Sequence, residues 1–415
     1  MRLALLGLDD QTQLIARAAA ASGRHQIALA CDLPPADRSM LKNAMPGAEE
    51  GPWELLLHEG RIDGVVVASP ADTAGNEFRA EQLRRLVQAA VPMLIAHPVV
   101  DSLIVYYELE MMRQDSRCII VPYLPARWSP AAARLAELVA AGDQSLIGAV
   151  DQAVFESSPV RRGRGDVLAQ FARDVDVIRV VCGDVTRIGA MGSPDAKAAL
   201  ANLGVQMSGA GPILTRWSIA PADDLPNRRL TLVGSRGKAV LHLPDDGAWQ
   251  LEIRPTGASQ AETVESTESA DWSAPVAALE ALAEALARQP MSSESNGTDN
   301  RGTEWAEAIR GIELAEAIGR SLARGRTIEV QREELSETNT FKSLMTAFGC
   351  GILMVAAGLI FGIALLAQIA KANGWQWLAG ALNSWPWVVL AVLGLFMVFQ
   401  LLLRLAEPPS GKKSG

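Results

Sequence analysis

Two long runs without charged residues, both near the C-terminus, constrain this chain more than any other feature. Residues 344–370 contain no Asp, Glu, Lys or Arg, and residues 385–403 form a second uncharged, mainly apolar run. A helix needs about 20 apolar residues to cross the hydrocarbon layer of a membrane. The sequence therefore predicts transmembrane helices at 344–370 and 385–403.

Basic residues flank the two runs unevenly. Before the first run and after the second stand Arg324, Arg326, Arg332, Lys342, Arg404, Lys412 and Lys413, whereas the loop between the runs carries Lys371 alone. Positively charged flanks stay on the cytoplasmic side of a membrane. We expect a hairpin in the lipid bilayer, with the preceding domains and the C-terminus in the cytoplasm.

Charge and cysteine spacing limit which partners the chain can bind. The formal net charge is −9 and the pI is about 5.2, whereas nucleic-acid binding needs a concentrated basic face. The four cysteines lack the spacing of metal ligands, so we expect free thiols and no metal site. Gly358 and Gly362 are spaced for close helix packing, within the hairpin or between two chains, which leaves a homo-oligomer open.

Alternating strands and helices predict the fold of the first domain. Short runs rich in Val, Ile, Leu and Ala occur at 2–8, 25–32, 63–69, 91–97 and 118–123, with helical patterns between them. Strands that alternate with helices form a doubly wound parallel sheet. We predict an α/β, Rossmann-like nucleotide-binding domain over residues 1–125.

The pattern changes after this domain. Strand-like runs follow at 147–156, 213–219, 230–233, 238–243 and 249–253, with one helix among them near 167–181. Residues 234–237 read Gly-Ser-Arg-Gly, which suits a hairpin turn. We predict an α+β domain of the substrate-binding or dimerisation type over residues 126–335, with an open, mainly antiparallel sheet.

Three segments resemble one known family. The run Asp-Gly-Val-Val-Val-Ala-Ser-Pro at 63–70 resembles its fourth strand, Leu-Val-Gly-Ser-Arg-Gly at 232–237 its sheet hairpin, and 305–321 its closing helix. In this order they resemble the Gfo/Idh/MocA family of glucose-fructose oxidoreductase and inositol dehydrogenase, over about residues 1–335. The resemblance implies an oxidoreductase that uses NAD or NADP on a sugar or cyclitol, with a membrane hairpin added.

The glycine-rich turn of that family is altered here. It reads Gly7-Leu8-Asp9-Asp10-Gln11-Thr12. Gly7 remains, but Asp9 and Thr12 replace the other two glycines, which puts a carboxylate where the cofactor pyrophosphate would meet the helix N-terminus. The alternative, compatible with the first, is that Asp9 or Asp10 caps the helix. Binding of NAD or NADP is thereby put in doubt.

Two strand ends carry further candidate residues. The resemblance implies that Asp32 binds the cofactor ribose, although an Asp before Leu33-Pro34-Pro35 is also an ordinary turn residue. His97 stands where the family has its catalytic Lys. A histidine can exchange a proton at neutral pH, but a single histidine at a strand end is more often a packed or surface residue.

The helix near 167–181 has lost both catalytic positions of the family. With Gly183 aligned to the family's closing glycine and Asp176 to its interior aspartate, Arg173 takes the position of the catalytic His. Ala169 then takes that of the Asp one turn earlier. Arginine cannot act as a base because its pKa stays above about 12. Asp176 is retained, and an aspartate on a helix is usually solvated or paired.

A group of arginines precedes this helix. Arg161, Arg162 and Arg164 would lie, with Arg173, near the mouth of the substrate cleft that the resemblance implies. Guanidinium groups bind phosphate or carboxylate groups through paired hydrogen bonds, so an anionic small molecule is a candidate partner. The alternative is an exposed loop whose arginines are solvated.

These replacements leave three hypotheses for the function. The first, which we favour because three positions are lost at separate sites, is a membrane-anchored, catalytically degenerate homologue of these oxidoreductases that acts in ligand binding or scaffolding. The second is an active NAD(P)-dependent oxidoreductase in which His97 or another residue supplies the proton. The third is an adaptor that recruits cytosolic partners through the polar region 256–301.

Overall fold

The computed structural model describes residues 1–33, 47–58, 60–71, 73–159, 161–195, 198–220, 228–256, 272–288 and 301–330, with four single positions between 362 and 372. Contacts divide the chain into two compact units, Met1–Arg332 and Glu333–Gly415. The helices expected at 344–370 and 385–403 fall almost wholly outside the described residues, so they stay a prediction. Within the described part, no helix is long and apolar enough to cross a membrane.

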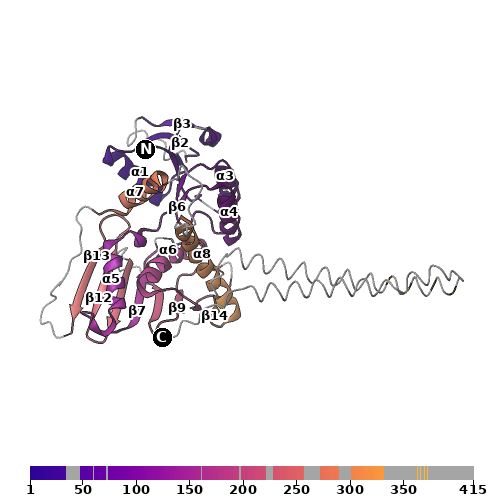
Figure 1. The fold of residues 1–415 in the computed structure, drawn as a ribbon. Coiled ribbons are helices and arrows are strands. Elements are labelled where there is room, and N and C mark those ends of the chain that lie inside the picture. Colours follow the sequence, from indigo (N-terminus) through magenta and orange to yellow (C-terminus); the bar gives the residue numbers. More distant parts are fainter. Residues whose placement is uncertain are drawn as a thin grey trace, which may run out of the picture. The chain divides into compact units, whose positions relative to one another are not determined.

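Six parallel strands form the first sheet, in the order β3-β2-β1-β4-β5-β6. They are β1 (Arg2–Leu6), β2 (Gln26–Cys31), β3 (Glu49–Gly51), β4 (Gly64–Val67), β5 (Met93–Ile95) and β6 (Ile120–Pro122). Figure 1 labels β2, β3 and β6 of this sheet. All pairings within it are parallel, so the Rossmann-like prediction is confirmed. The sequence does not predict β3, because Glu49, Glu50 and Gly51 carry no strand pattern.

Helices cover both faces of this sheet, as a parallel sheet buried on both faces requires. On one face pack α1 (Asp10–Ser22) and α7 (Ala274–Ala287), which share a core with Leu3, Leu5 and Val66. On the other pack α3 (Asn76–Gln88) and α4 (Leu103–Ser116). Figure 1 shows α7 beside α1 although some 250 residues separate them along the chain, so a segment that follows the second sheet in sequence helps to cover one face of the first sheet.

Eight strands form the second sheet, in the order β13-β12-β11-β7-β10-β9-β8-β14. They are β7 (Val150–Ser157), β8 (Arg187–Met191), β9 (Gly204–Ser208), β10 (Leu214–Ile219), β11 (Arg228–Gly234), β12 (Gly237–Leu243), β13 (Gln250–Pro255) and β14 (Ile328–Glu329). Only β7 and β10 pair in parallel, so the mainly antiparallel sheet is confirmed. Gly234 pairs with Gly237, which confirms the predicted hairpin.

Three helices pack on the second sheet: α5 (Pro130–Ala140), α6 (Arg164–Cys182) and α8 (Arg301–Arg324). Between sheet and helices the rings of Phe171 and Trp217 meet edge to face with centroids 5.4 Å apart. Because α8 contacts α4 and β6 as well as α6 and β8, it joins the two sheets (Figure 1). The 3-10 helices of the described part are η1 (Trp53–Leu57), η2 (Thr73–Gly75), η3 (Pro125–Arg127) and η4 (Gly142–Gln144).

Candidate functional site

The strand order of the first sheet reverses at β1 and β4, and ligands of doubly wound sheets bind beside the carboxyl ends of strands at such a point. Most of the residues that follow the strands at this edge are residues that the sequence singles out. Gly7 and Asp9 follow β1, Asp32 follows β2, Ser69 follows β4 and His97 follows β5. We call this group of five residues the switch point.

Asp9 is the N-cap of α1 and its carboxylate is fully engaged. Its Oδ1 accepts a hydrogen bond from the backbone N–H of Thr12 (2.7 Å), and its Oδ2 accepts one from the backbone N–H of Ser69 (2.8 Å). The Thr12 hydroxyl in turn accepts from the Asp9 N–H at 2.9 Å, which completes a capping box. The N-terminus of α1, a ready-made anion site, therefore already holds an anion of the chain itself.

Gly7 is in contact with Arg79, an arginine that the sequence does not single out. Gly7 has a φ of +77°, and a Cβ placed on it would lie 2.6 Å from Nη2 of Arg79 and 3.3 Å from Cβ of Ala68. Arg79 lies on α3 and is 6% exposed. The backbone conformation thus favours glycine here, and a side chain at this position would also have to displace the end of the Arg79 side chain.

Asp32 is also engaged within the chain. Its Oδ2 accepts a hydrogen bond from Nε2 of Gln82, which lies on α3 one turn after Arg79. The Asp32 backbone has a φ of +51°, a conformation that Asp tolerates in turns better than most residues. A ribose hydroxyl at this carboxylate would share it with Gln82.

His97 is buried between α4 and α8. The residue is 1% exposed, and its Nε2 lies 3.0 Å from where a Cβ on Gly311 of α8 would be. The ring of Tyr106 meets it edge-on at 6.4 Å, and Tyr106 stacks on Trp305 at 4.9 Å. Burial, helped by the charge of Arg173, lowers the pKa of His97 to about 3, against an opposing effect of the nearby Ala172 carbonyl. His97 is therefore a neutral, packed ring at pH 7.

The backbone of His97 is also fixed. Its N–H donates to Oε1 of Gln11 (3.0 Å), and its carbonyl accepts from Nε2 of the same side chain (2.8 Å). Gln11 lies in the first turn of α1 and is buried. This paired contact ties the end of β5 to the helix that Asp9 caps.

On α6, Arg173 and Ala169 are both partly exposed. Arg173 donates from Nη2 to Oε1 of Gln170 (2.7 Å), and burial, then the charge of Arg228, lowers its pKa. Gln170 bridges Arg173 and Asp174, because its Nε2 donates a hydrogen bond to Oδ1 of Asp174 at 2.8 Å. The guanidinium of Arg173 is thus a hydrogen-bond donor within α6.

Asp174 is wholly buried and accepts several hydrogen bonds, a role that the sequence does not predict. It accepts hydrogen bonds from Nε1 of Trp217 (2.9 Å), Nη1 of Arg228 (3.2 Å) and Gln170. Its neighbour Asp176 accepts from Arg127, at 3.1 Å from Nε and 2.7 Å from Nη2. Burial raises the pKa of Asp176, against the opposing charge of Arg127. Both oxygens of Asp174 are thus occupied by partners in the fold, whereas Arg127 meets only Oδ1 of Asp176 and the buried Oδ2 has no hydrogen-bond partner among the described residues.

The three arginines at the start of α6 and just before it do not share contacts with Arg173. Arg161 is exposed, Arg162 donates to the carbonyl of Ala220 (3.3 Å) and Arg164 to that of Asp195 (3.2 Å). Arg164 and Arg173 are nine residues apart on one helix, about 13 Å at ~1.5 Å per residue. The described contacts therefore place Arg173 with Gln170 and Arg228, and the loop arginines elsewhere.

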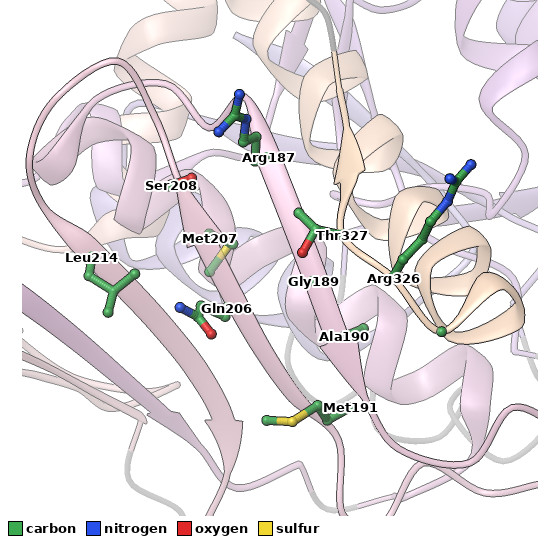
Figure 2. Close-up of a pocket in the computed structure, with 11 residues that line it drawn as sticks. Arg187, Gly189, Ala190, Met191, Gln206, Met207, Ser208, Leu214, Arg326 and Thr327 are labelled. Carbon is green, nitrogen blue, oxygen red and sulfur yellow. The ribbon is translucent and has the colours of Figure 1, made fainter.

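A separate surface pocket lies at the edge of the second sheet (Figure 2). Residues of β8, β9 and the segment between α8 and β14 line it, together with Leu214. In Figure 2 the guanidinium groups of Arg187 and Arg326 extend away from each other, and Arg187 pairs with Glu329 at 3.1 Å. Charged groups do not converge there as they do at a catalytic site.

The residues of the switch point do not fit a dinucleotide in this arrangement. A pyrophosphate at the N-terminus of α1 would meet the Asp9 carboxylate, and like charges repel strongly where water is scarce. Within the described residues, no three His, Cys, Asp or Glu side chains lie close enough together to hold a metal ion. What the arrangement can do is donate hydrogen bonds, through arginine side chains, to a bound group.

Solved structures share this fold. The chain matches a myo-inositol dehydrogenase from Corynebacterium glutamicum with 19% identity and a TM-score of 0.57, covering 80% of this chain and 99% of that one. The aldose-aldose oxidoreductase of Caulobacter crescentus gives 14% identity and 0.61, over 80% and 99% of the two chains.

A third solved structure is the WlbA dehydrogenase of Chromobacterium violaceum, in complex with NADH and UDP-GlcNAcA. It gives 14% identity and a TM-score of 0.59, over 80% of this chain and 97% of that one. No protein-family model matches the sequence, and no curated protein matches it. The structural neighbours are thus oxidoreductases of the Gfo/Idh/MocA type, and at these identities the likeness shows the fold.

Proposed function

We propose that this protein is a membrane-anchored homologue of the Gfo/Idh/MocA oxidoreductases that has lost hydride transfer and acts in ligand binding or scaffolding at the cytosolic face of the membrane. One observation carries the proposal: the carboxylate of Asp9 takes the N–H groups of Thr12 and Ser69 at the N-terminus of α1. A cofactor pyrophosphate would need those donors and that positive end of the helix.

The groups that would move a proton also support the proposal. Oxidation of a hydroxyl needs a base near the substrate. His97 is neutral but enclosed, Arg173 cannot accept a proton, and Asp174 is bonded to three donors. Arg173 and Asp174 thus have structural partners, and the His97 ring, whose two nitrogens make no hydrogen bond, is enclosed where a substrate would need it open.

The alternative is an active NAD(P)-dependent oxidoreductase. The first sheet favours it, since its topology is that of a dinucleotide-binding domain and a neighbour of the same fold binds NADH. The version in which His97 is the base has less support, because burial lowers its pKa to about 3. The adaptor hypothesis depends on 256–301, of which 257–271 and 289–300 lie outside the described residues.

Titration of the full chain, purified in detergent, with NAD and NADP tests the loss of cofactor binding. We expect no saturable heat at millimolar concentration in isothermal titration calorimetry. Asp9→Gly removes the carboxylate and frees the N–H groups of Thr12 and Ser69, so this variant should gain measurable dinucleotide binding. Asp10→Gly, which removes an exposed charge from the same turn, is the matched control and should not. Micromolar binding by the unaltered protein would overturn the proposal.

Membrane anchoring is tested on the full chain in cells. We expect the protein to stay in the membrane fraction after an alkaline wash. Leu359→Arg puts a charge into the middle of the run 344–370, at a cost to insertion of about 3 kcal/mol, and should release part of the protein. Asn373→Cys in the loop should react with an impermeant thiol reagent only from the side opposite to Ser410→Cys. Reaction of Asn373→Cys and Ser410→Cys from the same side would reject the hairpin.

A further inference from the structure

Arg79 is a buried charge at the switch point that has no partner in the described part of the chain. It lies on α3 with its guanidinium against Gly7 and is 6% exposed. Its Nε and Nη1 atoms are shielded from solvent and make no hydrogen bond. Buried charged groups are normally paired, because removal from water is costly unless a partner compensates.

The neighbouring carboxylates do not supply this partner. Asp9 is bonded to Thr12 and Ser69, and Asp32 is bonded to Gln82. No salt bridge joins either of them to Arg79. Burial lowers the pKa of Arg79 to about 10, while the more distant charges of Asp32 and Asp9 oppose the shift. The guanidinium is therefore still positive at neutral pH, and its donors are unsatisfied.

A second unpartnered polar atom lies on the same side of α3. Gln82 is fully buried, and its Nε2 donates to Asp32, but its Oε1 has no hydrogen-bond partner. Residues three apart on a helix are neighbours on one face. Arg79 and Gln82 thus place guanidinium donors and a carbonyl acceptor, none of them with a partner among the described residues, one turn apart on the buried face of α3.

We propose that Arg79 and Gln82 bind the oxyanion of a small molecule that also carries a hydroxyl group, such as a sugar phosphate or a hydroxy acid. The oxyanion accepts from Arg79, and the hydroxyl donates to Oε1 of Gln82. This site deepens the proposed binding role and rests on it. It differs from a dinucleotide site because the oxyanion lies at α3, whereas the N-terminus of α1 stays occupied by Asp9.

Binding measurements on the full chain in detergent test this site. The probes are ribose 5-phosphate, malate, inorganic phosphate and uncharged ribose, each followed by calorimetry and by the thermal unfolding temperature. We expect ribose 5-phosphate or malate to bind and to raise the unfolding temperature, and ribose to do neither. The comparison of ribose 5-phosphate with malate decides between phosphate and carboxylate as the oxyanion.

Variants on α3 locate the binding. Arg79→Met should weaken it at least tenfold, and Gln82→Leu should weaken ribose 5-phosphate while leaving inorganic phosphate, which has no sugar hydroxyl, little changed. Arg85→Gln is the control, because Arg85 lies on the exposed side of α3, paired with Glu81. If Arg79→Met does not fold, Arg79→Lys keeps the charge, loses the paired donors and should still weaken binding.

Two results would overturn the site: no anion-dependent shift in the unaltered protein, as expected if ordered water alone meets Arg79, or binding that survives Arg79→Met. Dinucleotide titration of the same preparations keeps the two proposals apart. Binding of NAD would count against loss of the cofactor. A loss of ribose 5-phosphate or malate binding in Arg79→Met, without any NAD binding, would support both proposals.

Discussion

A cluster of buried and partly buried arginines and one isolated buried arginine in this protein have opposite surroundings. Between α6 and α8, Arg127, Arg179 and Arg310 each bond at least one carboxylate; Glu307, for example, accepts from Arg127 at 2.8 Å and from Arg179. At the switch point, Arg79 is as deeply buried but has no such partner. The arginines between α6 and α8 have the carboxylate partners that a structural network needs. Arg79 has no anionic partner among the described residues.

The largest effect should follow from breaking the paired group. Glu307→Ala leaves Arg127 and Arg179 without their shared carboxylate in a buried place, where the side chain of Arg179 is 3% exposed. Because Asp176 and Asp184 still pair with these two arginines, we expect the free energy of unfolding to fall by about 3 kcal/mol in chemical denaturation, the lower end for a broken buried ion pair. Glu284→Ala, which breaks the exposed pair with Arg288, should change it little. A small loss in Glu307→Ala would mean that the network does not stabilise the fold.

An intermediate effect is expected at His97, a buried ring that feels the charges of Arg127 and Arg179. The unfolded chain binds a proton near pH 6.5, whereas folded His97 does so only near pH 3. Stability should therefore fall as pH drops through this window, by about 2 kcal/mol between pH 7 and pH 5 for this group. His97→Gln should remove this part of the pH dependence. Denaturation midpoints at both pH values, compared between the two proteins, measure it, and parallel losses would place the titration elsewhere.

The smallest effect should have the opposite sign. In the absence of any added anion, Arg79→Met removes a buried charge that lacks a partner. We expect the free energy of unfolding to rise by about 1 kcal/mol, in contrast to the loss in Glu307→Ala. Denaturation in a buffer free of phosphate and carboxylates checks this. A loss of several kcal/mol would show that Arg79 is a structural member of the fold, like Arg127.

The sequence predicts the sheets better than the site. Long apolar runs such as Val65, Val66 and Val67 mark buried strands, and Gly234 with Gly237 marks the hairpin. The strands it misses are short and weakly apolar: β3, β8, β9 and β14. Their pairing depends on contacts with distant strands, which local patterns do not carry.

The site residues differ in how far the sequence could reveal them. Asp9 as an N-cap follows from local preference, because the cap is made within one turn. Asp174 and Gln82 owe their roles to partners 43 and 50 residues away, which no local pattern encodes. Arg79 did carry a signal: it stands on the stripe that also holds Gln82, Leu83 and Leu86, where a core residue is expected.

The contact between Gly7 and Arg79 couples two positions that lie far apart in the sequence. A methyl group on Gly7 would meet Nη2 at 2.6 Å, in addition to the strain of a φ of +77°. In a double-mutant cycle, Gly7→Ala should therefore lower the free energy of unfolding less in an Arg79→Ala background than in the unaltered protein. The loss that remains in the Arg79→Ala background should equal the backbone strain. We therefore expect Gly7 and Arg79 to change together in homologues. Gly7 resembles the remnant of a cofactor motif, and its contact with Arg79 would be the reason that it is retained.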